Sequence, residues 1–214
     1  MGRKSSIAEN KYQREKMKSF REFLTEELIS PSTIPGTISC WHGGRLDDAY
    51  NETIAHKKGR YEYGPGLYLS TSYNAVEKYH KGSRRLYLIT IEKGNDTNNT
   101  DIPVDVILEW INHYVIRSKR FEVLDAIQRR TENGKFNAQI FINILINNDA
   151  IKSMDTGSLR KFLVNQHVDY SEVHNAFGWG ETMIVLFNMR KIIDKKVVTP
   201  KDKIETYDLP TEWN

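Results

Sequence analysis

The sequence predicts an α+β protein with a mainly antiparallel or mixed sheet. Runs rich in β-branched and aromatic residues, typical of strands, lie on both sides of a block with helical periodicity that covers about 103–166. These runs do not alternate with helices at a regular βαβ spacing, so a fully parallel sheet is not favoured. The 214 residues are 39% hydrophobic, which is enough apolar material for one domain with appendages.

The two ends of the chain differ from its middle. Residues 12–28 place aromatic and aliphatic side chains mostly at helical intervals among charges, as in an amphipathic helix. The segment "SPSTIPG" then ends this helix, because it contains two prolines and a glycine. We therefore assign 1–34 to an N-terminal amphipathic helix and linker, 35–194 to the domain, and the charged, irregular residues 195–214 to a C-terminal tail.

The elements of the domain follow from local patterns. The segment 72–80, "SYNAVEKYH", has the character of a helix with Ser72 as its N-cap. Helical periodicity returns in several segments of the block at 103–166. We expect strands at 37–42, 66–71, 84–94, 168–173 and 181–187.

Composition excludes several chemistries. The formal net charge of +3 permits contact with nucleic acid without arguing for it. A single cysteine, Cys40, cannot form an intramolecular disulfide and fits a reducing compartment. The sequence lacks phosphate-loop, dinucleotide-loop and zinc-protease motifs, and its six histidines show no metal-ligand spacing. With no apolar run long enough to span a bilayer, we expect a cytoplasmic protein without a membrane partner or a metal.

The first candidate segment is "CWHGG", a histidine followed by two glycines at a strand end. The glycines let a ligand approach the backbone, and His42 offers a ring nitrogen to a hydroxyl such as that of a ribose. Taken alone, the segment fits better with a tight turn that leaves His42 in solvent.

The second candidate segment is "YGPGLYLSTSYNAVEKY", which places Tyr68 on a strand and Tyr79 at the end of the following helix. A strand and a helix joined by a tight turn can bring two aromatic rings to the sides of a flat heterocycle. The commoner fate of tyrosine is ordinary half-buried packing.

The third candidate segment is "GWGETMIVLFNMRKI", in which Glu181 begins an apolar strand. A carboxylate at this position, beside a cleft, can stabilise positive charge that develops on a sugar carbon. The alternative is a solvated glutamate at a strand end.

Together, the three segments resemble the ADP-ribosyltransferase fold of the diphtheria-toxin and poly-ADP-ribose-polymerase type, whose signature positions are His, Tyr and Glu. "WHGG" is similar to the first motif of that family, and the eleven-residue gap between Tyr68 and Tyr79 is similar to the spacing in its second motif. "GWGETMIVLFNMRKI" is similar to the last motif, and "HVDYSEV" resembles the strand before it in many phage and bacterial members. The resemblance covers roughly 37–193 in order and implies a split, mainly antiparallel sheet with the helical block as an insertion.

The resemblance implies a role for each matched residue. His42 would hydrogen-bond the adenosine-side ribose of NAD, and the backbone of Gly43 would hold the nicotinamide amide. Tyr68 and Tyr79 would pack against the nicotinamide ring.

The chain departs from the family at the catalytic position. Counted back from Phe187-Asn188, the family glutamate falls on Met183, and Glu181 lies two residues earlier on the same face of the strand. A bulge at the strand start would bring Glu181 closer to the site, so Glu181 is the candidate catalytic residue. The sequence leaves open whether this carboxylate acts or the site is inactive.

The function implied is an NAD-dependent mono-ADP-ribosyltransferase. It would transfer ADP-ribose to a macromolecular acceptor, a protein or a nucleic acid, and release nicotinamide through an oxocarbenium-like state without a metal. The alternative, motivated by Met183, is an inactive module that binds NAD, ADP-ribose or a partner protein. A related RNA 2′-phosphotransferase ranks last, because its arginine-rich signature is not evident.

The helical block is expected to serve the acceptor or a partner rather than NAD. It interrupts the matched core, and it carries basic stretches at 117–120 and 128–130. A solvated helix face explains these charges equally well.

Overall fold

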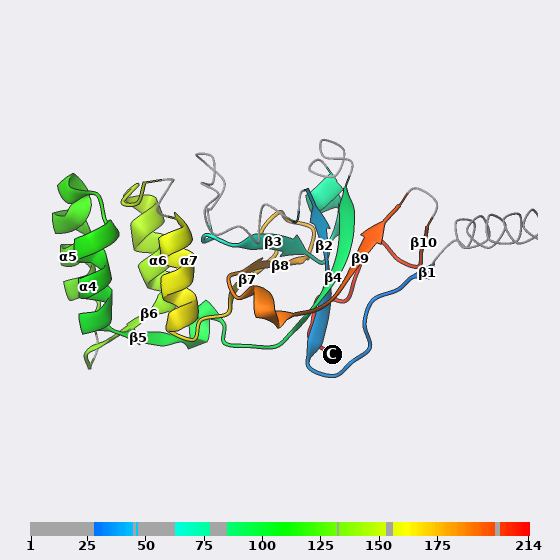
Figure 1. The fold of residues 1–214 in the computed structure, drawn as a ribbon, viewed down its shortest axis with the longest axis horizontal. Coiled ribbons are helices and arrows are strands. Elements are labelled where there is room, and N and C mark those ends of the chain that lie inside the picture. Colours follow the sequence, from blue (N-terminus) through cyan, green and yellow to red (C-terminus); the bar gives the residue numbers. More distant parts are fainter. Residues whose placement is uncertain are drawn as a thin grey trace, which may run out of the picture.

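The computed structural model describes residues 28–44, 46, 63–77, 85–131, 133–152, 156–199 and 202–214. Within these ranges the chain forms a six-stranded sheet and a group of four helices, which lie at opposite ends of the molecule (Figure 1). The predicted α+β class with a mainly antiparallel sheet is therefore confirmed. The predicted N-terminal helix, apart from Leu28, and Tyr79 lie outside the described residues.

The main sheet has the strand order β7-β8-β3-β2-β4-β9, and every neighbouring pair is antiparallel. Five of its strands correspond to the five strands expected from the sequence. The strands are β2 (Thr37–Gly43), β3 (Leu67–Ser70), β4 (Leu86–Glu92), β7 (Tyr170–His174), β8 (Thr182–Leu186) and β9 (Ile192–Val198).

The sheet is weakly joined at its centre. Strand β2 pairs with β4 along its whole length, and β3 pairs with β8 along its whole length. Between β2 and β3, however, the register contains only the pair Trp41 and Ser70. The two halves of the sheet therefore separate beyond this point, between the strand that carries His42 and the strand that carries Tyr68.

Alternating side chains give the sheet two buried faces. On β3, Leu67 and Leu69 pack into a core together with Cys40 and Ile89 from the neighbouring half of the sheet. Tyr68 points to the other face, where it is half-buried against the core of the helical block. Because directly paired residues share a face, Tyr68 lies on the side of its β8 partner, Val185.

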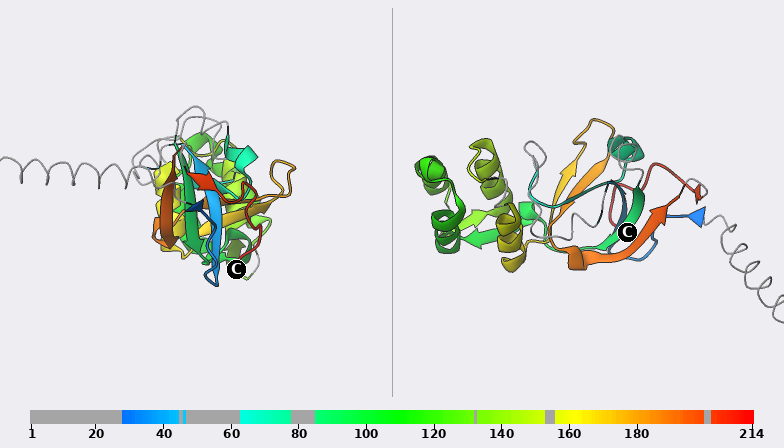
Figure 2. Two further views of the ribbon diagram at one scale, coloured as in Figure 1. Left: turned by 90° about the vertical axis from the view of Figure 1, so that its right-hand side faces the viewer. Right: turned by 45° about the horizontal axis from the view of Figure 1, so that its top comes forward.

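The helices of the block pack around an apolar core of their own, and this core also contacts β8. Its helices bury one apolar stripe each, and Phe141, Ile142 and Leu163 are almost fully buried. The same cluster includes Val185 and Phe187, so the block also packs against the sheet. Figure 2 shows these helices gathered beyond one end of the curved strands. They are α4 (Val104–Tyr114), α5 (Arg120–Gln128), α6 (Ala138–Asn147) and α7 (Thr156–Asn165).

Two short sheets of two strands each lie outside the main sheet. Strands β5 (Asp101–Pro103) and β6 (Lys135–Asn137) pair antiparallel at the base of the helices. Strands β1 (Leu28–Ile29) and β10 (Lys203–Ile204) pair in parallel, far from the helical block. None of the described helices has the length and apolar character that a membrane crossing requires.

The predicted C-terminal tail belongs to the domain. Its first residues, from 195, lie inside β9, an edge strand whose exposed lysines gave the sequence its irregular look. Beyond β10 the chain returns to the sheet: Leu209 N–H donates to Thr71 C=O at 3.1 Å, and Asn214 N–H donates to Thr37 C=O at 2.9 Å. The predicted boundaries at 34 and 194 therefore do not coincide with breaks in the structure.

Candidate functional site

The three sequence motifs occupy three adjacent strands. His42 lies near the end of β2, Tyr68 lies in β3, and Met183 lies in β8, with β3 in the middle. Met183 is paired with Ser70, two residues along β3 from Tyr68, and therefore lies on the same face as Tyr68. The fold thus gathers segments that are more than a hundred positions apart in the chain.

His42 links the two halves of the sheet at the place where they separate. Its Nδ1 is 3.0 Å from the carbonyl oxygen of Tyr68. Because a carbonyl oxygen can only accept, Nδ1 carries the proton, and Nε2 of the neutral ring is an acceptor. The ring also lies 6.0 Å, centroid to centroid, from the ring of Tyr87.

The Nε2 atom of His42 is the unusual atom of this site. It is buried, yet it has no hydrogen-bond partner among the described residues. A buried polar atom without a partner costs about 1–3 kcal/mol, and such atoms in a folded protein call for an explanation. Burial also lowers the pKa of His42 below its usual value, against a smaller opposing effect of the bond to Tyr68, and this favours the neutral ring.

The two glycines after His42 differ in what they do. Gly43 is the last residue of β2 and is opposite Leu86 of β4, so it continues the ladder. Gly44 has φ of 141°, a conformation that favours glycine, and a Cβ there would stand 3.5 Å from Nε2 of His42. The backbone at Gly44 therefore passes directly beside the unpartnered nitrogen.

Tyr68 is held by the turn that precedes it. Its hydroxyl donates to Gly64 C=O at 3.0 Å and accepts from Tyr63 N–H at 3.3 Å. The hydroxyl therefore fixes the turn, and the ring lies half-buried between this turn and the helical block.

The glycines of the "GPG" turn are explained by packing. A Cβ on Gly66 would come within 2.5 Å of Leu186 C=O, and one on Gly64 would come within 2.9 Å of the Phe187 ring. Gly64 also has φ of 122°. This part of the second motif is required by the close approach of β3 to β8, whatever it contributes to a ligand.

Glu181 is buried in the β7–β8 hairpin, with 2% of its surface exposed. Its Oε1 accepts from Phe177 N–H at 2.5 Å, and its Oε2 accepts from Trp179 N–H at 3.1 Å. Its own C=O accepts from Asn175 N–H at 2.7 Å. The carboxylate thus organises the loop that precedes it, a structural role that accounts for its burial.

That loop carries two aromatic side chains into solvent. Phe177 is 43% exposed and Trp179 is 57% exposed, with ring centroids 6.1 Å apart. The following Gly180 adopts a positive φ and donates to Asn175 Oδ1 at 2.8 Å, which closes the loop. The sequence analysis did not single out these rings, although two aromatics between glycines were the available signal.

Asp169 is a second buried group that the sequence analysis missed. Its Oδ1 accepts from Asn188 Nδ2 at 2.7 Å, and its Oδ2 accepts from Asn95 N–H at 2.9 Å. Its side chain also fills the space beside Gly94, where a Cβ would meet it. Asp169 and Asn188 therefore join the ends of β4 and β8 at the edge of the motif region.

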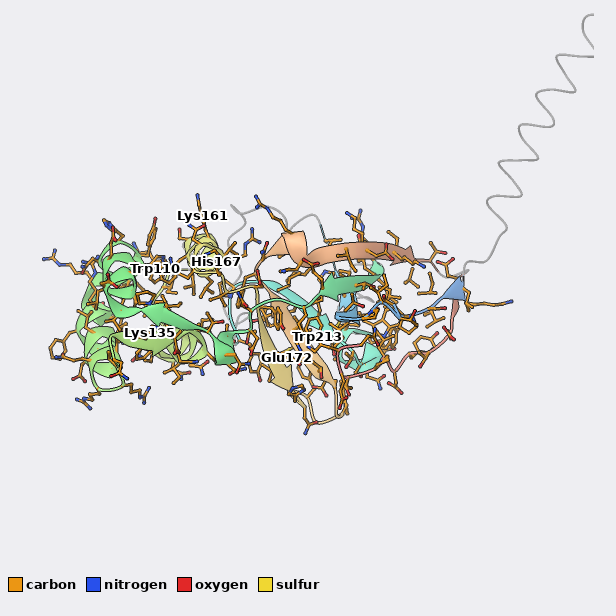
Figure 3. The ribbon with its side chains drawn as sticks, turned by 90° about the horizontal axis from the view of Figure 1, so that it is seen from below. Trp110, Lys135, Lys161, His167, Glu172 and Trp213 are labelled. Carbon is orange, nitrogen blue, oxygen red and sulfur yellow. The ribbon has the colours of Figure 1, made fainter. Side chains whose placement is uncertain are left out.

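The C-terminal residues close the sheet on the β7 side. The Trp213 ring lies 5.3 Å from the Tyr170 ring, and its Nε1 donates to Glu172 Oε2 at 3.1 Å. Figure 3 shows Trp213 and Glu172 beside each other, away from Trp110 in the helical block.

The structure brings His42, Tyr68 and Met183 onto adjacent strands, and Glu181 immediately precedes β8. Tyr79 lies outside the described residues. The described residues contain no cluster of three or more His, Cys, Asp or Glu side chains able to hold a metal ion. No protein-family model, curated protein or solved structure matches the chain.

Proposed function

We propose that the chain binds NAD at the junction of β2 and β3 and acts as a mono-ADP-ribosyltransferase. The observation that carries the proposal is the buried, unpartnered Nε2 of His42. An acceptor nitrogen in this position suits a hydroxyl donor such as a ribose, which would remove the cost of the missing hydrogen bond.

Three further features support the proposal. The sheet separates between β2 and β3, in agreement with the split sheet that the resemblance implies. The ring of Tyr68 is only half-buried and belongs to the strand next to His42, at the same junction, although the pairing of Trp41 with Ser70 puts the two rings on opposite faces of the sheet. Glu181 immediately precedes the adjoining strand β8, two residues before Met183, which shares the face of Tyr68.

In the proposed reaction, the bond between nicotinamide and ribose breaks with its electron pair leaving on the nicotinamide nitrogen. The positive charge that develops on the ribose would be stabilised by the carboxylate of Glu181. A nucleophilic group of the acceptor then bonds to the anomeric carbon and gives up its proton, and Tyr68 would hold the departing ring.

A second candidate function has its own supporting observation. Both carboxylate oxygens of Glu181 already accept backbone hydrogen bonds, and the register position of the family glutamate is the buried Met183. These features favour a module that binds NAD or ADP-ribose without transferring it.

The experiment that separates the candidates measures binding and turnover on the same protein. Calorimetry with NAD should show binding, and labelled NAD with a cell lysate should yield both labelled macromolecule and free nicotinamide. Binding without either product would favour the second candidate, and absence of binding would contradict both.

The variant His42→Phe tests the observation itself. Removal of the acceptor nitrogen should weaken NAD binding by roughly 5- to 150-fold, the equivalent of about 1–3 kcal/mol. The matched control is His174→Phe, because the His174 side chain is 71% exposed and β7 is separated from β2 by two strands. Equal NAD affinity in both variants would show that His42 does not contact the ligand.

A further inference from the structure

The helical block carries an open hollow of about 700 Å³ where α4 ends. Its lining includes the segment Val115–Ile116, which pairs with the chain after α6: Val115 forms a bridge with Ile151, and Ile116 N–H donates to Ala150 C=O at 2.9 Å. The helical turn η2 (Arg117–Lys119) and the start of α5 form one wall. The hollow is thus built by three segments held in fixed register.

The charges that line this hollow are all basic. Arg117, Arg120 and Lys152 contribute cations from three different segments, and the described lining residues include no acidic side chain. None of the three forms an ion pair within the described part of the chain. Arg120 is also fixed in place, because its Nε donates to Val115 C=O at 3.1 Å.

Two described acidic side chains of α5 pair with cations outside the hollow. Glu122 pairs with Lys119 at 3.1 Å, and Asp125 pairs with Arg129 at 2.7 Å. Neither Lys119 nor Arg129 lines the hollow. The positive charge of the hollow is therefore not neutralised by these carboxylates.

The hollow also offers a flat aromatic surface. Tyr114 lines it and is 39% exposed, while Trp110 covers one face of its ring at a centroid distance of 5.2 Å and an angle of 27°. Trp110 is itself anchored in the core against Phe141 and Phe162. Immediately after Arg120, Phe121 is 81% exposed.

We propose that this hollow is a binding site for single-stranded nucleic acid. Arginine forks and a lysine suit the phosphates of a strand, and a supported, exposed tyrosine suits the stacking of an unpaired base. An acidic protein face would use the cations but would have no need of the aromatic ring. The proposal does not depend on NAD chemistry, and if the proposed function holds, it supplies the class of acceptor.

The test uses the full chain and a fluorescently labelled oligodeoxythymidylate of about 15 nucleotides, with binding followed by anisotropy. Affinity should fall steeply as salt is raised from about 50 to 200 mM. The triple variant Arg117→Ala, Arg120→Ala, Lys152→Ala should flatten the log–log salt slope by about 2, since each phosphate contact on a single strand contributes about 0.7.

The matched control for charge is Lys119→Ala, which removes a neighbouring cation that does not line the hollow. It should leave both the affinity and the salt slope nearly unchanged. For the aromatic surface, Tyr114→Ala should weaken binding about tenfold, and Tyr114→Phe should retain it because the ring remains. Thermal unfolding of each variant checks that the helical block stays folded.

Three results would overturn the proposal. The first is an oligonucleotide affinity that the triple variant and Lys119→Ala reduce equally. The second is competition by polyglutamate at the same charge concentration, which would assign the hollow to an acidic protein. The third is tighter binding of duplex DNA than of the single strand.

Discussion

Two polar side chains are buried at strand ends in this molecule, and they differ in whether all of their polar atoms have hydrogen-bond partners. At the β7–β8 hairpin, both carboxylate oxygens of Glu181 accept a backbone N–H, so its burial is explained by the loop that it organises. At the end of β2, Nδ1 of His42 donates to the carbonyl oxygen of Tyr68, whereas Nε2 is buried without a partner among the described residues. A satisfied group is accounted for by the fold, whereas an unsatisfied one, such as Nε2 of His42 or Nε1 of Trp110, calls for an explanation.

The largest expected effect concerns Glu181, because it tests whether a satisfied carboxylate can also act in catalysis. Glu181→Gln keeps one acceptor oxygen and loses the charge. Nicotinamide release should fall about a hundredfold or more if the charge stabilises the oxocarbenium-like state. NAD affinity should hardly change, because that charge develops only in the transition state. Single-turnover kinetics and calorimetry measure the two quantities.

The same variant has a structural consequence. One of the N–H groups of Phe177 and Trp179 loses its acceptor, which should lower the free energy of unfolding by about 1–3 kcal/mol. Denaturant unfolding measures this loss. A loss of stability with an unchanged rate would confine Glu181 to the hairpin and favour the binding module.

An intermediate effect is expected at Tyr68, whose hydroxyl has hydrogen-bond partners, as the Glu181 carboxylate has, and whose ring is a candidate ligand contact, as His42 is. Its hydroxyl serves the turn at Gly64, and its ring is the candidate contact for nicotinamide. Tyr68→Phe should lower the free energy of unfolding by about 1 kcal/mol and keep NAD affinity. Tyr68→Ala should weaken NAD binding by about 1–3 kcal/mol, the scale of one aromatic stack. Equal NAD affinity in the two variants would mean that the ring only packs.

The smallest effect is the pH dependence that His42 imparts to stability. Burial lowers its pKa in the folded protein, so below pH of about 6.5 the unfolded chain binds the proton more readily than the folded chain. The free energy of unfolding should therefore fall as the pH drops from about 6.5 toward the lowered pKa. Urea unfolding across this range measures the slope, and His42→Phe should reduce it. An unchanged slope in the variant would place the pH dependence elsewhere.

Local patterns predicted the strands well and the ends of the domain poorly. The strands in "GLYLST" and "ETMIVLF" were readable because both are short, largely apolar runs whose side chains are buried on the two faces of the sheet. Strand β9 was missed because, at the sheet edge, only its terminal Val198 is buried, while Lys195 is exposed and Lys196 is half-buried. The tail at 202–214 carries no periodicity, since contacts such as Asn214 with Thr37 hold it in place.

The candidate site was predictable only as a set of residues. Spacing and resemblance named His42 and Tyr68, and the strand order placed them on adjacent strands. The bond from Nδ1 of His42 to Tyr68 C=O could not be predicted, because it depends on where two strands stop pairing. In the same way, the sequence indicated only a turn at Gly64 and Gly66, and the distances to Phe187 and Leu186 revealed their packing role.

By itself, the sequence determined the class of fold, the helical block and the positions of the motif strands along the chain, because periodicity and turn residues act over a few positions of the chain. The tertiary structure decided which buried polar atoms have partners. It satisfied Glu181 within its own hairpin and left Nε2 of His42 without a described partner beside Gly44. The physical reason is that satisfaction of a buried group depends on the angles and distances between segments far apart in the chain, which no local pattern encodes.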